Sequence, residues 1–222
     1  LDASADLESL EQQAARAEQA WRAHAQQVSR ARRSAAPKLS AAVSQAMQQL
    51  GMEGGRFEVS LQAVEEPQSF GLEQVEFLVA GHAGTSPRPL AKVASGGELS
   101  RLALAIAATT ARQRQAGGAV PTLIFDEIDA GVGGAVGDSV GRLMKQLGAD
   151  TQVLAVTHLA QVAACADGHF LVSKASGGGK TLTDVQPVGG EARVSEIARM
   201  LGGERLAGTS RAHAQALLGA SR

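Results

Sequence analysis

The sequence predicts an α/β fold in which helices flank a parallel sheet, preceded by a coiled-coil segment. Apolar runs at 122–125 and 152–157 have the length of buried strands, and helical apolar spacing follows each of them. The order strand, helix, strand, helix implies parallel pairing. A heptad repeat fills the sequence before Pro37. With 222 residues, 44% of them hydrophobic, the chain can build one substantial core.

The N-terminal segment repeats its mainly apolar residues at alternating steps of three and four, the spacing of a coiled coil. The repeat consists of Leu7, Leu10, Ala14, Ala17, Trp21, His24, Val28, Ala31 and Ala35. An amphipathic helix lying on the domain is the alternative. A coiled coil needs a partner helix from residues before Leu1 or from another molecule, because the chain has no second heptad segment. We expect Pro37 to interrupt the helix. Residues 1–36 are therefore assigned to the end of a coiled-coil arm and 37–222 to a globular lobe.

An antiparallel strand pair is expected directly after the arm. An apolar helical face continues beyond Pro37, and Gly51 is expected to end it. The segments 56–64 and 72–80 alternate apolar and polar residues, which is typical of half-buried strands. We expect these two strands to pair across a loop at 65–71.

The C-terminal third of the sequence predicts further helices and strands. A helical stripe covers 136–147, and 169–174 is expected to form a strand. The segment 181–188 predicts an edge strand that is joined to it by a glycine hairpin. Two helices are expected at 191–201 and 210–218.

The stretch Ser-Gly-Gly-Gly-Lys-Thr at 176–181 superficially resembles a phosphate-binding loop. The first glycine of that motif must lie five residues before the second, and this position is Lys174. A strand pattern follows the stretch instead of a helix, so the helix dipole is missing too. We interpret it as a hairpin turn.

The residues Ser95, Gly96, Gly97 and Glu98 predict a glycine turn that opens a helix. Serine followed three residues later by glutamate is a capping-box pattern. A helix start offers free backbone N–H groups to an anion. A capped helix with no ligand is the alternative. Two consecutive glycines favour a ligand, because they allow close approach to the backbone.

Two acids, Asp126 and Glu127, end the apolar run at 122–125. Unpaired carboxylates at the edge of a sheet are costly, so a cation is their natural companion. Alone, such a pair could simply begin a loop. His158 ends the run at 152–157, which is expected to lie beside the first strand. This placement favours a functional histidine, although a histidine after a strand is more often structural.

In combination, these motifs resemble the signature and Walker B motifs of an ABC-type ATPase head. The wider sequence resembles the RecN family of bacterial DNA-repair proteins, relatives of the SMC family. The resemblance covers nearly the whole chain and is carried by residues 56–59, 75–79, 92–101, 156–163 and 193–203. It implies that 37–222 is the C-terminal lobe of such a head. Walker A and the Q-loop are missing, and Ala94 and Glu98 depart from the general wording Leu-Ser-Gly-Gly-Gln.

The resemblance implies a role for each candidate residue. Asp126 would hold Mg²⁺, directly or through water, and Glu127 would orient or deprotonate the attacking water. His158 would contact the γ-phosphate of ATP as the switch histidine. Asp129 would belong to a D-loop that packs across a dimer. The γ-phosphate bound by the opposite head would be touched by the signature residues Ser95, Gly96, Gly97 and Glu98.

The resemblance therefore implies an ATP-hydrolysing head fragment that acts in recombinational repair of DNA double-strand breaks through ATP-dependent head association. Its partners would be the N-terminal part of the same protein, with Walker A and the opposite coiled-coil strand, a second head in a homodimer, and DNA. One competing interpretation is the nucleotide-binding subunit of a transporter, which the heptad arm disfavours because transporter heads couple through surface loops. Another is a non-enzymatic interaction module, which the retained acids and histidine disfavour.

Composition limits the remaining classes. A formal net charge of −1 argues against nucleic-acid binding by bulk basicity. A local contact through the arm remains open, and its basic residues are Arg16, Arg22, Arg30, Arg32, Arg33 and Lys38. The single Cys165 lies in an apolar helical run and is expected to be a small core residue. No signal peptide and no span of about 20 apolar residues is found, so we expect a cytoplasmic protein without a membrane partner. The RecN resemblance implies that it is bacterial and nucleoid-associated.

Overall fold

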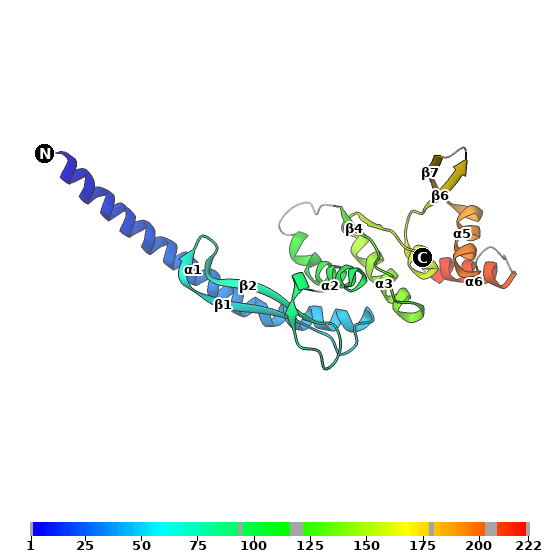
Figure 1. Ribbon diagram of the computed structural model, residues 1–222, viewed down its shortest axis with the longest axis horizontal. Coiled ribbons are helices and arrows are strands. Elements are labelled where there is room, and N and C mark those ends of the chain that lie inside the picture. The colour runs from blue at the N-terminus through cyan, green and yellow to red at the C-terminus, as the bar shows by residue number, and fades with distance from the viewer. Residues whose placement is uncertain (1, 93–94, 116–121, 178–179, 203–207, 221–222) are drawn as a thin grey trace.

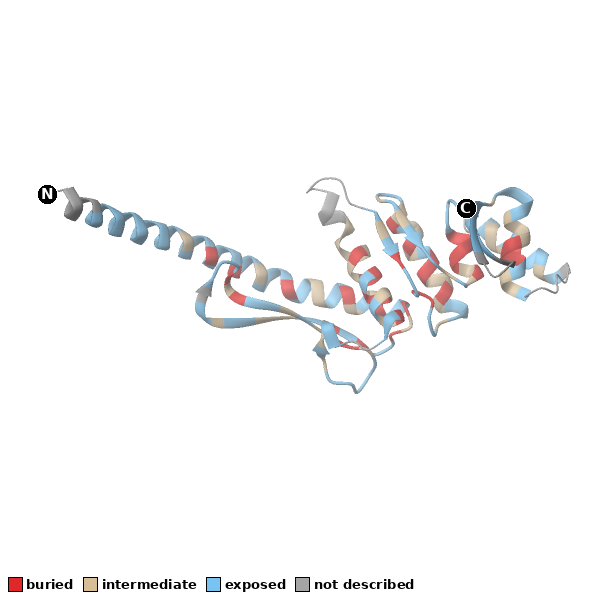
Figure 2. Ribbon diagram, turned by 45° about the horizontal axis from the view of Figure 1, so that its top comes forward, coloured by how far each residue is buried: buried red, intermediate tan, exposed pale blue. Residues whose placement is uncertain are grey.

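The computed structural model describes residues 2–92, 95–115, 122–177, 180–202 and 208–220. A long N-terminal helix projects from a body that the rest of the chain forms (Figure 1). Buried residues gather where this helix meets the body, whereas its projecting part is exposed (Figure 2). Within the described ranges, no helix combines the length and apolar character that crossing a bilayer requires. The predicted α/β class, with helices around a small parallel sheet, is confirmed.

Helix α1 (Asp2–Gln49) is continuous, so the interruption expected at Pro37 is wrong. A proline inside a helix costs about 3 kcal/mol. Tertiary packing offsets this cost, because Val43, Met47 and Leu50 are fully buried and each such side chain contributes about 1.5–3 kcal/mol. The helix ends just before Gly51, as expected, and this glycine has the left-handed φ of 73° that is common after a helix. The division of the chain at Pro37 remains a prediction.

Strands β1 (Arg56–Gln68) and β2 (Gly71–Ala80) form the predicted antiparallel pair. Both strands reach further toward the turn than their alternation predicts, so the loop expected at 65–71 is shorter. The short strand β3 (Arg88–Pro89) pairs with the other side of β2, which leaves β1 at the edge of this three-stranded sheet. The 3-10 helix η1 (Leu90–Lys92) follows.

Side chains of α1 satisfy backbone groups along the edge of β1. The Oγ of Ser44 accepts a hydrogen bond from the N–H of Phe57 at 2.9 Å, and the Oγ of Ser40 accepts one from Val59 at 3.0 Å. One helical turn further on, the Nε2 of Gln48 donates to the backbone just before β1 at 3.0 Å. Open strand edges are templates for pairing with another chain. The helix therefore covers an edge that would otherwise be open.

The contact between α1 and the hairpin continues around the buried carboxylate of Glu73 in β2. The hydroxyl of Ser29 donates to this carboxylate, and Arg33 forms an ion pair with it at 3.2 Å. Arg32 lies 3.8 Å from the same side chain and donates to the carbonyl of Phe70 at 2.9 Å. Arg32 and Arg33, two basic residues of the arm, thus bind groups of the hairpin.

The parallel sheet lies in the body. Helix α2 (Gly96–Gln115) precedes β4 (Leu123–Phe125), and α3 (Gly134–Gly148) precedes β5 (Val153–Ala155). As predicted, β4 and β5 pair in parallel. One core joins these elements to α1 and the hairpin. Its largest fully buried side chains are Val43, Met47, Leu50, Met52, Leu102, Leu104, Ile128 and Val140.

The C-terminal elements form a second core. Helices α4 (Ala160–Cys165), α5 (Gly190–Gly202) and α6 (Gly208–Ala220) pack together through Ile197, Ala198, Ala214 and small residues of α4. Strands β6 (Phe170–Gly177) and β7 (Lys180–Pro187) form an antiparallel hairpin. Within the described residues β6 therefore does not extend the parallel sheet, although it follows the same strand and helix order.

Two smaller predictions concern the ends of these elements. Gly177 pairs with Lys180 at the tip of the β6–β7 hairpin, which agrees with a hairpin turn in place of a phosphate-binding loop. The glycines at 178–179 lie outside the described residues. Cys165 is buried as expected, and a Cβ added at Gly141 of α3 would lie 2.8 Å from its Sγ. The absence of a side chain at Gly141 therefore lets α3 and α4 approach closely.

Candidate functional site

The start of α2 is capped as the sequence predicts. The backbone N–H of Glu98 donates to the Oγ of Ser95 at 3.4 Å, and the N–H of Leu99 donates to the carbonyl of Ser95 at 3.0 Å. The carboxylate of Glu98 lies 3.4 Å from the Nε2 of His82, in the loop after β2. The preceding Ala94, part of the motif comparison, lies outside the described residues.

The two glycines of this turn face the chain's own loop after β4. A Cβ added at Gly97 would lie 2.9 Å from the Cβ of Ala130 and 3.0 Å from its carbonyl oxygen. A Cβ added at Gly96 would lie 2.8 Å from the Oε2 of Glu127, which is the far end of a flexible side chain. Packing within the chain is therefore enough to require glycine at Gly97. Gly96 is exposed and less constrained.

Asp126 and Glu127 follow β4 directly, and both are exposed. The Oδ1 of Asp126 accepts a hydrogen bond from the N–H of Glu127 at 2.9 Å, and its carbonyl accepts one from the hydroxyl of Ser100 at 2.7 Å. Glu127 has a φ of 54°, the only positive φ of a non-glycine residue in the described part of the chain. Left-handed backbone costs such a residue about 1–2 kcal/mol. Strain of this kind is concentrated at functional sites.

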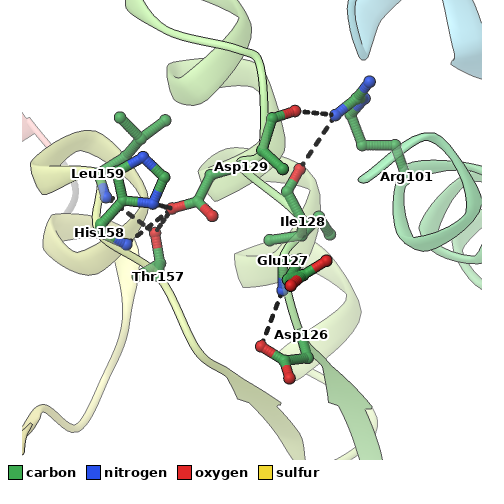
Figure 3. A network of polar contacts seen from close by, with 9 residues as sticks. Arg101, Asp126, Glu127, Ile128, Asp129, Thr157, His158 and Leu159 are labelled. Carbon is green, nitrogen blue, oxygen red and sulfur yellow. Dashed lines mark hydrogen bonds and ion pairs between the residues drawn. The ribbon is translucent and has the colours of Figure 1, made fainter. Parts of the chain in front are cut away.

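Asp129 is 2% exposed and binds the loop that follows β5. Its Oδ2 accepts hydrogen bonds from the Thr157 hydroxyl, from the N–H of His158 at 2.8 Å and from the N–H of Leu159 at 3.1 Å (Figure 3). Burial raises the pKa of this carboxyl, but these hydrogen bonds and His158 outweigh burial, and the pKa lies below its usual value. The carboxylate is thus charged and surrounded by donors from its own chain.

Arg101 holds the other side of the same loop. Its Nη1 donates to the carbonyl of Ala130 at 2.9 Å and to that of Ile128 at 3.5 Å. The side chain is buried, and burial lowers its pKa, while Glu98 acts in the opposite direction. An arginine keeps its charge in proteins, so this contact joins α2 to the loop after β4 by charge-assisted hydrogen bonds.

The ring of His158 lies at the end of β5, with its Nδ1 3.2 Å from the Oδ2 of Asp129. Its side chain is 73% exposed. Because β4 and β5 are parallel neighbours, their carboxyl ends bring Asp126, Glu127 and this histidine to one edge of the sheet (Figure 3). The turn at the start of α2 lies beside the same loop. The structure therefore gathers all the predicted site residues in one region.

A divalent cation at this edge of the sheet would need water or substrate oxygens as ligands in addition to protein side chains. In the part of the chain that the structure describes, no group of three or more acid, histidine or cysteine side chains could hold a metal. Mg²⁺ is usually bound by one or two carboxylates together with waters and substrate phosphates. Asp126, an exposed carboxylate at the end of β4, satisfies that smaller requirement.

Comparison with known proteins places the sequence in a family, although no family model matches. The chain is 42% identical over 214 residues to the DNA repair protein RecN of Xylella fastidiosa (strain Temecula1), which covers 96% of this chain and 38% of that protein. It is 40% identical over 219 residues to RecN of Haemophilus influenzae, covering 98% and 38%. The chain belongs to the RecN family. It spans 38% of the length of these two RecN proteins.

The fold of this RecN-family chain has a counterpart among solved structures. The Smc head domain with a coiled coil and joint from Pyrococcus yayanosii has a TM-score of 0.51 and 26% identity, covering 72% of this chain and 28% of that one. The likeness supports the expectation of a head-type lobe attached to a long helix.

Sequence reasoning missed three residues that build the candidate site of this RecN-family chain. Ser100, Arg101 and Thr157 carry hydrogen bonds to the loop after β4, but no role was predicted for them. Arg101 lies four residues after Gly97, on the same face of α2, and Thr157 immediately precedes His158. The sequence signal for these residues was their position next to a predicted motif.

Asp129→Ala is expected to lower the free energy of unfolding by about 3 kcal/mol, because three donors lose a buried, charged acceptor. Asp126→Ala, in the same loop but exposed, is the control and should change it by less than about 0.5 kcal/mol. Since the folded pKa of Asp129 is lowered, its contribution is present above the usual carboxylate pKa and is lost as the pH falls through the folded value. Urea unfolding at neutral and acid pH measures both effects. Equal losses for the two variants would contradict the structural role.

Proposed function

We propose that this RecN-family chain is the ATP-binding and hydrolysing head fragment of a protein that acts in recombinational repair of DNA double-strand breaks. The observation that carries the proposal is the meeting of Asp126, Glu127 and His158 at the carboxyl ends of two adjacent parallel strands. Ligands of open α/β sheets bind at this end of the strands. The two RecN relatives, both named DNA repair proteins, supply the biological process.

Each residue has a role that suits its position. Mg²⁺ neutralises phosphate charge when ATP is bound, and Asp126 would hold it, directly or through water. Glu127, with its exposed carboxylate, would orient the attacking water or take its proton. His158 would contact the γ-phosphate. Hydrolysis of ATP depends mainly on such positioning and charge neutralisation.

The phosphate-binding loop would come from the N-terminal part of the same protein. Parallel sheets are normally covered on both faces. Here Ile124 is 70% exposed and its cross-strand neighbour Leu154 is 45% exposed. Leu99 of α2 is exposed as well, and it lines an open apolar pocket together with Ile124. An apolar surface of this kind beside the proposed site fits a missing lobe of the same head.

The arm and the signature turn suggest the remaining partners. Leu7 and Leu10 of α1 are exposed on the heptad stripe, which suits an opposite coiled-coil strand. Ser95 and Gly96 are exposed at the start of α2, where they would meet ATP bound by a second head in a homodimer. DNA would bind the whole assembly. Local basic residues of the arm that could add to this binding include Arg16, Arg30 and Lys38.

An ATPase assay of the separate and combined parts tests the proposal. The purified chain alone should hydrolyse ATP negligibly, because it has acids and a histidine but no phosphate-binding loop. Co-expression with the N-terminal part of the same protein should restore turnover, and Asp126→Ala should abolish it again. A combined preparation that binds no ATP, or an isolated chain as active as the combination, would refute the proposed site.

A further inference from the structure

A continuous set of polar contacts links α2 to the His158 loop within one chain (Figure 3). On one side, Arg101 binds the carbonyls of Ile128 and Ala130. On the other side, the side chain of Asp129, the residue between Ile128 and Ala130, points to the loop after β5. The short backbone segment 128–130 is therefore held from both directions. Nothing in a nucleotide-binding role for Asp129 requires this arrangement.

We propose that Asp129 is a positioning residue that fixes the ring of His158, and that Arg101 fixes Asp129. The carboxylate holds Nδ1 of the ring and turns Nε2 outward, toward the nucleotide or the attacking water. The catalytic consequence rests on the proposed function. The orientation of the ring is a property of the chain itself.

The contacts to Asp129 determine both the backbone and the ring of His158. The N–H groups of residues 158 and 159 bind the same oxygen, which sets where the Cα of the histidine lies. The Nδ1 of the ring, 3.2 Å from that oxygen, sets the direction of the ring. A carboxylate only accepts hydrogen bonds, so this 3.2 Å approach favours the ring form that carries a proton on Nδ1. In the neutral ring Nε2 is then the free acceptor, and it faces away from the carboxylate.

The burial of Asp129 decides between this role and contact with a second head. The side chain of Asp129 is 3% exposed, whereas that of His158 is 73% exposed. A partner molecule can reach the outward nitrogen of the ring, but the carboxylate is enclosed by its own chain. A carboxylate behind a functional histidine commonly fixes its tautomer and orientation. Asp129 occupies that position here.

Nitrogen NMR of the histidine rings tests the proposal without nucleotide. The 222-residue chain labelled with ¹⁵N-histidine has five rings, and His158→Gln identifies the signal of interest. At a pH where this ring is neutral, we expect the proton on Nδ1 in the wild-type protein. Asp129→Ala should shift the population toward the Nε2-protonated form, which predominates in water, and Arg101→Gln should shift it partly. Asp126→Ala, the control in the same loop, should leave it unchanged.

The wild-type spectrum alone can overturn the proposal, even where a variant fails to fold. A neutral His158 that carries its proton on Nε2 would show that Asp129 does not fix the ring. Unchanged signals of the other four histidines show that a variant is folded, and an unchanged His158 signal in folded Asp129→Ala would also contradict the proposal. Failure of ATP hydrolysis in the combined parts would refute the proposed function and leave the ring orientation standing.

Discussion

Glu127→Gln in the combined RecN head is expected to reduce ATP turnover by at least about 100-fold while ATP still binds. The amide keeps the shape of the side chain but cannot take a proton, and Asp126 remains available for the metal. The exposed carboxylate of Glu127 points from a strained backbone position, and the variant preserves that geometry. Single-turnover hydrolysis and filter binding of ATP, measured in parallel, separate chemistry from binding. A variant that hydrolyses ATP normally would remove Glu127 from the mechanism.

The same variant should accumulate as an ATP-dependent dimer of heads, since uncleaved ATP keeps both halves of a shared site together. Ser95→Arg added to Glu127→Gln should prevent this dimer, because Ser95 is exposed at the start of α2. Ser95→Thr keeps the helix cap and serves as the control. Gly97 is unsuitable for this test, since a side chain there would collide with Ala130 of its own chain. Light scattering with ATP gives the outcome, and equal dimerisation of all variants would exclude a shared site.

Ile124→Asp is expected to abolish association with the N-terminal part and, with it, ATP hydrolysis. This side chain is 70% exposed in the chain alone, so the stability of the isolated chain should change by less than about 0.5 kcal/mol. In a complete head the new carboxylate would be buried without a partner, which costs several kcal/mol. Ile124→Leu retains the apolar surface and should associate normally. Calorimetric titration measures the binding, and unimpaired association of Ile124→Asp would show that the missing lobe lies elsewhere.

The apolar spacing of the sequence predicts much of the fold, and the error at Pro37 has an identifiable cause. Alternation at 56–64 and 72–80 predicts the hairpin because half-buried strands repeat every two residues. The interruption expected at Pro37 is wrong because tertiary packing outweighs the local effect of the proline. Val43, Met47 and Leu50 lie fully buried beyond the proline, and their contacts with the body are invisible in a local sequence window. Tertiary contacts commonly override a local propensity.

The candidate site could be located from sequence, but its internal contacts could not. Asp126 and His158 end two apolar runs, so parallel pairing alone brings them to one edge. The contacts of Asp129 join residues about thirty positions apart, and they depend on which way its side chain turns. The resemblance implies that Asp129 belongs to a D-loop that packs across a dimer. In the structure, its burial and its hydrogen bonds join it to its own chain.

The polar contacts between α1 and the first hairpin have a mechanical consequence. Ser40, Ser44 and Gln48 bind the backbone of β1 and the residues just before it, and Arg33 binds Glu73 further up, so the helix and the hairpin cannot slide past each other without breaking several hydrogen bonds. The loop after β2 carries the His82 that contacts Glu98 at the start of α2. A force on the distal end of α1 would thus be transmitted through the hairpin to the turn at the start of α2, where the second head is expected to dock.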